Sequence, residues 1–159
     1  MQLRGTDIVV DKIRAKKNII SGSGATASLS ESDSGSQVLL DRAEGIVFTL
    51  PAGCAIGTTY DFIATVSVTT NAYKIITGAG TELLIGGYTS VDTDSSNAVA
   101  VFTGNGSTHI ALNMTAASTN ALGGIQGTAV RFTKLTSTLW EVSGVVMCGG
   151  TPATAFATS

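Results

Sequence analysis

Short apolar runs separated by turn residues are the dominant pattern along this chain. Val38–Leu40 and Ile46–Leu50 are the first clear pair. Turn residues bracket both runs, at Asp33–Gly35, Asp41–Gly45 and Pro51–Gly53. Runs of this length, rich in branched and aromatic residues and closed by glycine or proline, are typical of β-strands. Because only a short polar link joins the two runs, the pattern predicts a β-hairpin.

The same pattern continues to the end of the chain. It predicts further strands over Thr59–Val68, Tyr73–Thr77, Glu82–Ile85, Ala98–Thr103, Thr108–Asn113, Thr128–Leu135 and Leu139–Cys148. About ten short strands and no helical stretch favour an all-β fold. We expect a single antiparallel β-sandwich, jelly-roll-like or barrel-like domain. Within it, Trp140 is expected in the core, with Val142 on the same face of its strand and Phe132 in the strand before it.

The links between these strands differ in length. Gly104–Ser107 has Asn-Gly at its centre, which supplies the positive φ values of a tight hairpin turn between the flanking strands. Two polar stretches, Tyr88–Asn97 and Thr115–Gly127, are expected as long loops.

The first 36 residues differ from the rest of the chain. Ile8-Val9-Val10 is followed by a basic run that ends at Lys17, then by Ile19-Ile20 and a Gly/Ser-rich stretch. Such a stretch buries too little apolar surface to offset the entropy lost on ordering. We therefore expect residues 1–29 to form an extended N-terminal docking arm that orders against a partner, and residues 30–159 to form the all-β domain. The alternative is an ordinary first strand followed by a loop.

Charge is scarce and unevenly distributed. Charged residues make up 13% of the chain, about half the usual share of roughly 25%, and the net charge is −2. The weakly charged exterior suits a surface that neighbours cover, although a simply low-charge β domain would have the same composition. The acidic balance argues against nucleic acid as a partner. A basic arm on an acidic body is a recurrent docking arrangement, and the basic residues of this arm are Arg4, Lys12, Arg14, Lys16 and Lys17.

No stretch carries a catalytic signature. His109 is the only histidine and lies in an expected strand, without cysteine or carboxylate at metal-ligand spacing. Asp92–Asn97 resembles the start of a calcium loop but lacks the glycine and glutamate that such loops require. Nucleophile-elbow, phosphate-loop and zinc-protease motifs are missing. We expect no enzymatic activity, cofactor or metal.

Cysteine usage and hydropathy suggest where the protein is made. Neither a signal peptide nor a membrane-spanning run is recognisable, so we expect synthesis in a reducing cytosol and no membrane partner. Cys54 and Cys148 are then expected to be free thiols, with a Cys54–Cys148 bond as the alternative.

The order of several motifs resembles a class of small structural proteins of tailed-phage virions. The resemblance covers roughly residues 30–156 and lies in the segments Asp33–Gly35, Thr49–Ala52, Gly57–Ile63, Lys74–Gly80, Gly127–Leu135 and Trp140–Gly144. Proteins of this class serve as capsid decoration (cement) proteins and as modules of tail or head fibres. The decoration proteins are typically trimers seated on the outer shell. The resemblance implies a structural, non-enzymatic role.

These observations predict a capsid decoration protein on the outer capsid surface of the virion, assembled in the host cytoplasm. Its partner would be the major capsid protein. The residues expected to dock are the basic side chains Arg4, Lys12, Arg14, Lys16 and Lys17, together with Ile8, Val9 and Val10, which would add a strand to a neighbour's sheet.

The assembly and an alternative function complete the expectations. A homotrimer is expected, because it would cover apolar strands such as Ala98–Phe102 if these lie at a sheet edge. The alternative function is a head- or tail-fibre module that binds a host-surface receptor or glycan. Its site would lie in Tyr88–Asn97, where an exposed aromatic or polar sugar site would be required.

Overall fold

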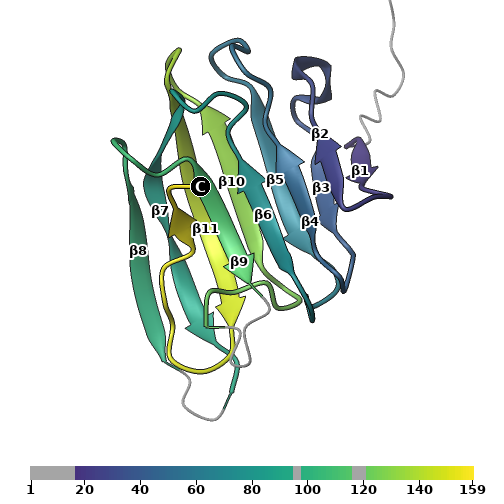
Figure 1. Cartoon of the computed structure of the whole chain (residues 1–159), viewed down its shortest axis with the longest axis vertical. Coiled ribbons are helices and arrows are strands. Elements are labelled where there is room, and N and C mark those ends of the chain that lie inside the picture. Colours follow the sequence, from purple (N-terminus) through teal and green to yellow (C-terminus); the bar gives the residue numbers. More distant parts are fainter. Residues whose placement is uncertain (1–16, 95–97, 116–120) are drawn as a thin grey trace, which may run out of the picture.

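Two β-sheets packed face to face form a sandwich in the computed structural model, which describes residues 17–94, 98–115 and 121–159 (Figure 1). The larger sheet has seven strands in the order β1-β3-β5-β10-β11-β7-β8, and the smaller has five in the order β12-β9-β6-β4-β2. The elements are β1 (Ile19–Ser21), β2 (Thr26–Ser28), the 3-10 helix η1 (Glu31–Asp33), β3 (Gln37–Leu40), β4 (Ile46–Thr49), β5 (Thr59–Ala64), β6 (Ala72–Ile76), β7 (Leu83–Asp92), β8 (Val99–Asn105), β9 (Ala111–Thr115), β10 (Ala129–Lys134), β11 (Leu139–Cys148) and β12 (Phe156–Ala157). No helix in these ranges is long and apolar enough to cross a membrane.

The first half of the chain winds as a flattened coil. Strands β1 to β6 alternate between the two sheets, and each of β1 to β4 pairs in parallel with the strand two places later. The predicted hairpin of Val38–Leu40 and Ile46–Leu50 is therefore wrong, because β3 and β4 lie in different sheets. Gly45 in the link between them has φ 82°, and a Cβ there would lie 2.4 Å from the carbonyl oxygen of Ala72. The close approach of the link to β6 thus requires glycine.

The second half has longer strands and mixed pairing. Strand β10 pairs antiparallel with β5 and β11, β11 pairs in parallel with β7 over ten residue pairs, and β7 pairs antiparallel with β8. The prediction of an all-β sandwich is right, but the sheets are mixed rather than antiparallel. The physical reason is that most short links cross from one layer to the other, so a strand's sequence neighbour is seldom its partner in the sheet.

Two link predictions fail in this half. The long loop expected at Tyr88–Asn97 is wrong as far as Asp92, because β7 continues to that residue. Tyr88, Ser90 and Asp92 are all buried, so the strand alternates normally but carries polar residues on its inner face. The Asn105-Gly106 turn does form, with Gly106 at φ 64°, but it leads from β8 to β9 in the other sheet, so the predicted hairpin is also wrong.

The described part of the expected N-terminal arm lies against the sandwich. Ile19–Ser21 form β1 and Thr26–Ser28 form β2, which are edge strands of the two sheets. Residues 1–16, which include most of the expected docking side chains, lie outside the described residues. Of the second expected loop, 121–127 contain no strand, and 116–120 lie outside the described residues.

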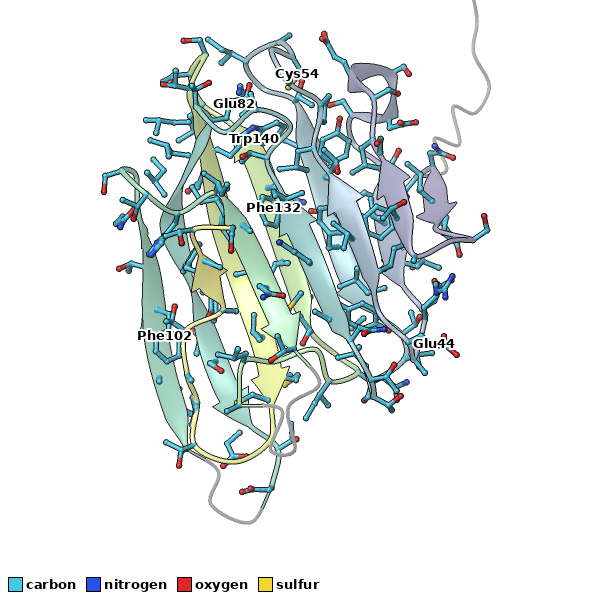
Figure 2. The ribbon with its side chains drawn as sticks, viewed as in Figure 1. Glu44, Cys54, Glu82, Phe102, Phe132 and Trp140 are labelled. Atoms are coloured by element: carbon cyan, nitrogen blue, oxygen red, sulfur yellow. The ribbon has the colours of Figure 1, made fainter. Side chains whose placement is uncertain are left out.

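Aromatic side chains fill the space between the sheets. Trp140, Phe132 and Phe62 are fully buried, which confirms the predicted place of Trp140 in the core (Figure 2). The rings of Phe62 and Phe132 meet edge to face with centroids 5.5 Å apart, and Phe62 meets Phe48 in the same way at 5.6 Å. Edge-to-face pairs of this kind add to the stabilisation from apolar burial alone. Cys54 and Cys148 are buried and free, as predicted.

Candidate docking surface

An uncharged row of side chains crosses the outer face of the seven-stranded sheet. Strand pairing aligns one residue from each strand, in the order Val101, Thr89, Val145, Ala129, Ile63, Leu39 and Ser21. Apart from the exposed Gly144, their neighbours along each strand are buried or partly buried and point inward, so these side chains point outward. At about 4.8 Å per strand the row is roughly 29 Å long. We call it the outer row.

The exposed large apolar side chains of the outer row lie on β8 and β11. Val101 retains 70% of its accessible surface, and Val145 retains 36%. Val99, the next outward residue of β8, is 64% exposed. Single exposed apolar side chains are common, but contiguous apolar patches mark sites of interaction.

Three charged side chains of this face lie together beside the outer row, and a fourth, Glu141 of β11, lies next to Thr133 and Ile85 in the neighbouring strands. The guanidinium of Arg131 donates to both carboxylate oxygens of Asp61, at 2.6 and 3.0 Å, and the ammonium of Lys17 also binds Asp61. A shallow groove of about 320 Å³ runs past this cluster over Ala129 and Ser143, whose small side chains leave the space open. The cluster of Arg131, Lys17 and Asp61 keeps one net positive charge, and Glu141 on the same face offsets it, so the face as a whole has little net charge.

Lys17 is the one predicted docking residue within the described ranges. Its ammonium contacts Asp61 of the same chain, and 42% of its side chain is exposed. Exposed ion pairs of this kind contribute at most about 1 kcal/mol. The structure therefore brings Lys17 to the edge of the outer face, while Arg4, Ile8, Val9 and Val10, together with Lys12, Arg14 and Lys16, lie outside the described residues.

The outer face of the five-stranded sheet is different in character. Its corresponding row is Thr26, Val47, Lys74 and Asn113, three of which are polar. Thr26 is exposed and Lys74 is partly exposed, so these polar side chains can stay hydrated without a cover. The two faces therefore differ in the chemistry that they offer to another protein.

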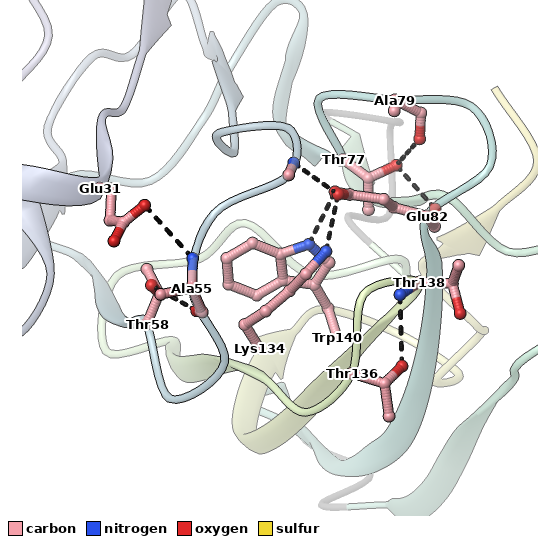
Figure 3. A network of polar contacts seen from close by, with 11 residues as sticks. Glu31, Ala55, Thr58, Thr77, Ala79, Glu82, Lys134, Thr136, Thr138 and Trp140 are labelled. Carbon is pink, nitrogen blue, oxygen red and sulfur yellow. Dashed lines mark hydrogen bonds and ion pairs between the residues drawn. The ribbon is translucent and has the colours of Figure 1, made fainter.

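A buried charge network closes one end of the sandwich (Figure 3). Glu82 Oε2 accepts a 3.0 Å hydrogen bond from Trp140 Nε1, and Glu82 Oε1 accepts a 2.9 Å hydrogen bond from the Gly53 N–H. Lys134 Nζ lies 2.7 Å from Glu82 Oε1, as an ion pair rather than a well-aligned hydrogen bond, and 5.0 Å from the Trp140 ring centroid. In Figure 2, Glu82 and Cys54 lie at the same end of the sandwich, opposite Glu44.

The network fixes the protonation of Glu82. Burial alone would raise the pKa of this carboxyl group, but the contact with Lys134, the two hydrogen bonds and the Lys134 charge together lower it. Burial likewise raises the pKa of the Cys54 thiol nearby, so that thiol stays protonated. With every carboxylate oxygen engaged and both ionic side chains buried, the network has a structural role and holds the loop at Gly53 against β10 and β11.

The remaining residues that the sequence singled out are tied into the fold. Tyr88 is 2% exposed and its hydroxyl accepts a 2.6 Å hydrogen bond from the Ala155 N–H, so it is no surface aromatic for a glycan. His109 stacks on Phe156 with centroids 5.4 Å apart, and its Nδ1 accepts from the Asn105 N–H at 3.3 Å. Across the ranges that the structure describes, no three His, Cys, Asp or Glu side chains are grouped as a metal site would need.

Comparisons with known proteins do not assign the chain to a family. No family model matches the sequence, and no curated protein matches it. The case for a function therefore rests on the surface described above and on the motif order.

Proposed function

We propose that this protein is a capsid decoration (cement) protein of a tailed-phage virion, which binds the outer surface of the head shell and bridges subunits of the major capsid protein. The observation that carries the proposal is the uncharged outer row, which spans all seven strands of one sheet. The motif order supports it further. A protein that works by covering joints needs one broad face with little charge and needs no catalytic group.

The energetics of such a role follow from the chemistry of the face. Apolar area removed from water contributes about 25 cal/mol per Å², but association costs several kcal/mol in lost freedom, so one copy holds weakly. Many copies attached to one shell gain by avidity. The basic segment would add attraction that salt screens, and Ile8–Val10 would add main-chain hydrogen bonds that salt leaves intact.

The first test places a charge in the middle of the outer row. Ala129→Glu should reduce co-sedimentation with undecorated heads, because it adds to the middle of the row a carboxylate whose desolvation costs several kcal/mol. Thr26→Glu is the matched control, since Thr26 is also an exposed outward strand residue but lies on the five-stranded sheet. Equal co-sedimentation of both variants with the parent protein would reject this face as the docking surface.

The second test concerns the N-terminal segment. Deleting residues 2–16 leaves β1 and the Lys17–Asp61 contact in place. The shortened protein should stay folded and lose shell binding, and the binding of the full chain should weaken from low to high ionic strength. Full co-sedimentation of the shortened protein would show that the segment is dispensable and leave docking to the outer row alone.

A further inference from the structure

One of the four sheet edges is unlike the others. The edges formed by β1, β2 and β12 are two or three residues long, whereas β8 has seven residues. Natural proteins protect edges by keeping them short or by placing charges and proline in them. Strand β8, V-A-V-F-T-G-N, contains neither a charge nor proline. The edge position expected for Ala98–Phe102 is confirmed, and no strand among residues 17–94, 98–115 and 121–159 other than β7 pairs with β8.

The free hydrogen-bonding groups of β8 can be assigned from its pairing with β7. Asp92 N–H donates to the Ala98 carbonyl at 2.8 Å, and Gly106 N–H donates to the Leu84 carbonyl at 2.9 Å. Antiparallel pairs alternate between hydrogen-bonded and non-bonded positions. The main-chain groups of even-numbered β8 residues therefore face β7, and those of Val99, Val101 and Thr103 point away from the sheet.

We propose that β8 of a second copy of this chain covers the edge, antiparallel and centred on Val101. In this register Val101 faces Val101, Val99 faces Thr103 and Ala100 faces Phe102. The first two pairs join β-branched residues, which pack well across strands, and the third joins a small side chain to a large one. Each of the outward-pointing residues exchanges two hydrogen bonds with its counterpart. The seven-stranded sheets of the two copies then become continuous.

The register centred on Phe102 is less favourable. If the pair were centred on Phe102, Val99 would face Asn105. The Asn105 N–H already donates to His109 Nδ1, and the Asn105 side chain binds the Thr108 hydroxyl and the N–H groups of residues 107–109. Centring on Val101 uses only groups that point to solvent. Because the strand carries no charge, placing it opposite itself brings no like charges together.

The apolar run Ile8–Val10 of the same chain cannot add a strand beside β8. Such a strand lies seven strand spacings from β1, or about 34 Å. Ile8 precedes Lys17 by nine residues, which span at most about 32 Å when fully extended. The Lys17 side chain is held at Asp61, and the Asn18 carbonyl accepts from the Gln37 N–H on β3, at the opposite end of the sheet. A second copy supplies a matching edge without this restriction.

The decisive experiment measures solution mass by light scattering and sedimentation over a range of protein concentrations. The parent protein should be a dimer. Val101→Lys should raise the dimer dissociation constant about tenfold or more, because it places two ammonium groups opposite each other. Ile56→Lys is the matched control, since Ile56 is also 70% exposed but lies in a loop outside β8. It should leave the dimer unchanged.

A cross-linking experiment reports the register directly. Val101→Cys should form a disulfide between two copies on mild oxidation, since facing residues in such a pair have Cα atoms about 5.5 Å apart. The native thiols are buried and do not compete. Val145→Cys, two strands inward on the same face, should not cross-link.

Three results would overturn the inference: a monomeric parent protein, a parent trimer, or a Val101→Lys protein that dimerises like the parent. A trimer would restore the assembly expected from the sequence. None of these results bears on shell binding, which the co-sedimentation of Ala129→Glu and Thr26→Glu decides separately. The pairing thus stands or falls independently of the proposed function.

Discussion

The two halves of this sandwich use the same residue types to build different connectivity. In the first half, β1 to β6, strands of three to six residues alternate between the sheets and pair in parallel. In the second half, β7 and β11 run for ten residues and have neighbours of both orientations. The comparison teaches that short apolar runs with glycine-rich links do not specify hairpins. Whether a link turns back or crosses to the other layer depends on tertiary contacts.

The halves also end differently. The coil ends in the short edges β1 and β2, whereas the seven-stranded sheet ends on the other side in the long, uncharged edge β8. The first end is protected by its brevity, and the second is available to another chain. The predictions below test how strongly the halves depend on each other, beginning with the largest effect.

Trp140 joins the halves and its removal should cost most. The indole from β11 packs against Tyr60 of β5 with centroids 6.2 Å apart and donates to Glu82. Trp140→Ala should lower the free energy of unfolding by about 3–5 kcal/mol, as measured in denaturant. A single unfolding transition, shifted to lower denaturant, would show that the halves unfold as a unit. Two transitions would show that they unfold independently. Trp140→Phe keeps a ring and serves as the control for the lost hydrogen bond.

Breaking the buried ion pair should have the next largest effect. Lys134→Met leaves the Glu82 carboxylate buried without its counter-charge, which typically costs about 3 kcal/mol or more. The double variant Lys134→Met with Glu82→Gln removes both charges and should recover part of the loss. The two residues would be uncoupled if the losses in unfolding free energy of Lys134→Met alone and Glu82→Gln alone added up to the loss of the double variant.

The same pair predicts a pH dependence. The pKa of Glu82 in the folded protein is below its ordinary value of 4.5, so the carboxylate contributes stability above that pH. The contribution should be lost as the pH falls from 4.5 through the folded-state pKa. Unfolding measured between neutral and acidic pH should therefore show a smaller acid loss for Glu82→Gln than for the parent. Identical acid branches would contradict the lowered pKa.

A glycine pair tests the coil alone. Gly45 and Gly53 both have positive φ, at 82° and 64°, but only at Gly45 would a Cβ meet backbone, at 2.4 Å from the Ala72 oxygen. Gly53→Ala should cost about 1 kcal/mol from backbone strain, and Gly45→Ala should cost more, because β4 and β6 would be pushed apart. Equal losses in thermal unfolding would show that the close approach has no energetic weight.

The smallest expected effect is a difference in amide exchange rates between edge and central strands, measured by native-state hydrogen exchange. Amides of β1 and β2 should exchange faster than those of β11, because the former are short edge strands and the latter is central in its sheet. If Val101 pairs with its counterpart, its amide should be more protected in the parent dimer than in Val101→Lys. Equal exchange rates for β1 and β11 would contradict the difference between edge and centre.

The strands were predictable and their partners were not. Alternation in segments such as Ala129–Lys134 is a local property of the sequence, and β10 and β11 lie where it placed them. The end of β7 was predicted as a loop because Ser90 and Asp92 are polar. Their burial depends on neighbours that are distant along the chain. The same holds for the candidate surface. The outer row takes one residue from each of seven strands, so no window of sequence contains it.

The parallel pairing of β7 and β11 has a consequence for the order in which the molecule is assembled. Each coil strand has a partner only two strands away along the chain, so the coil can close while the chain is still being made. Strand β11 instead pairs with β7, which lies far earlier in the chain, and must enter between β10 and β7 with Leu139 beside Leu83. Until β11 is in place, the facing edges of β10 and β7 are unpaired and the core lacks the Trp140 side chain. Contacts between residues so distant along the chain form slowly. In pulse-labelled hydrogen exchange, β3 to β6 should gain protection before β7 and β11, and the emerging chain is most prone to mispairing in that interval.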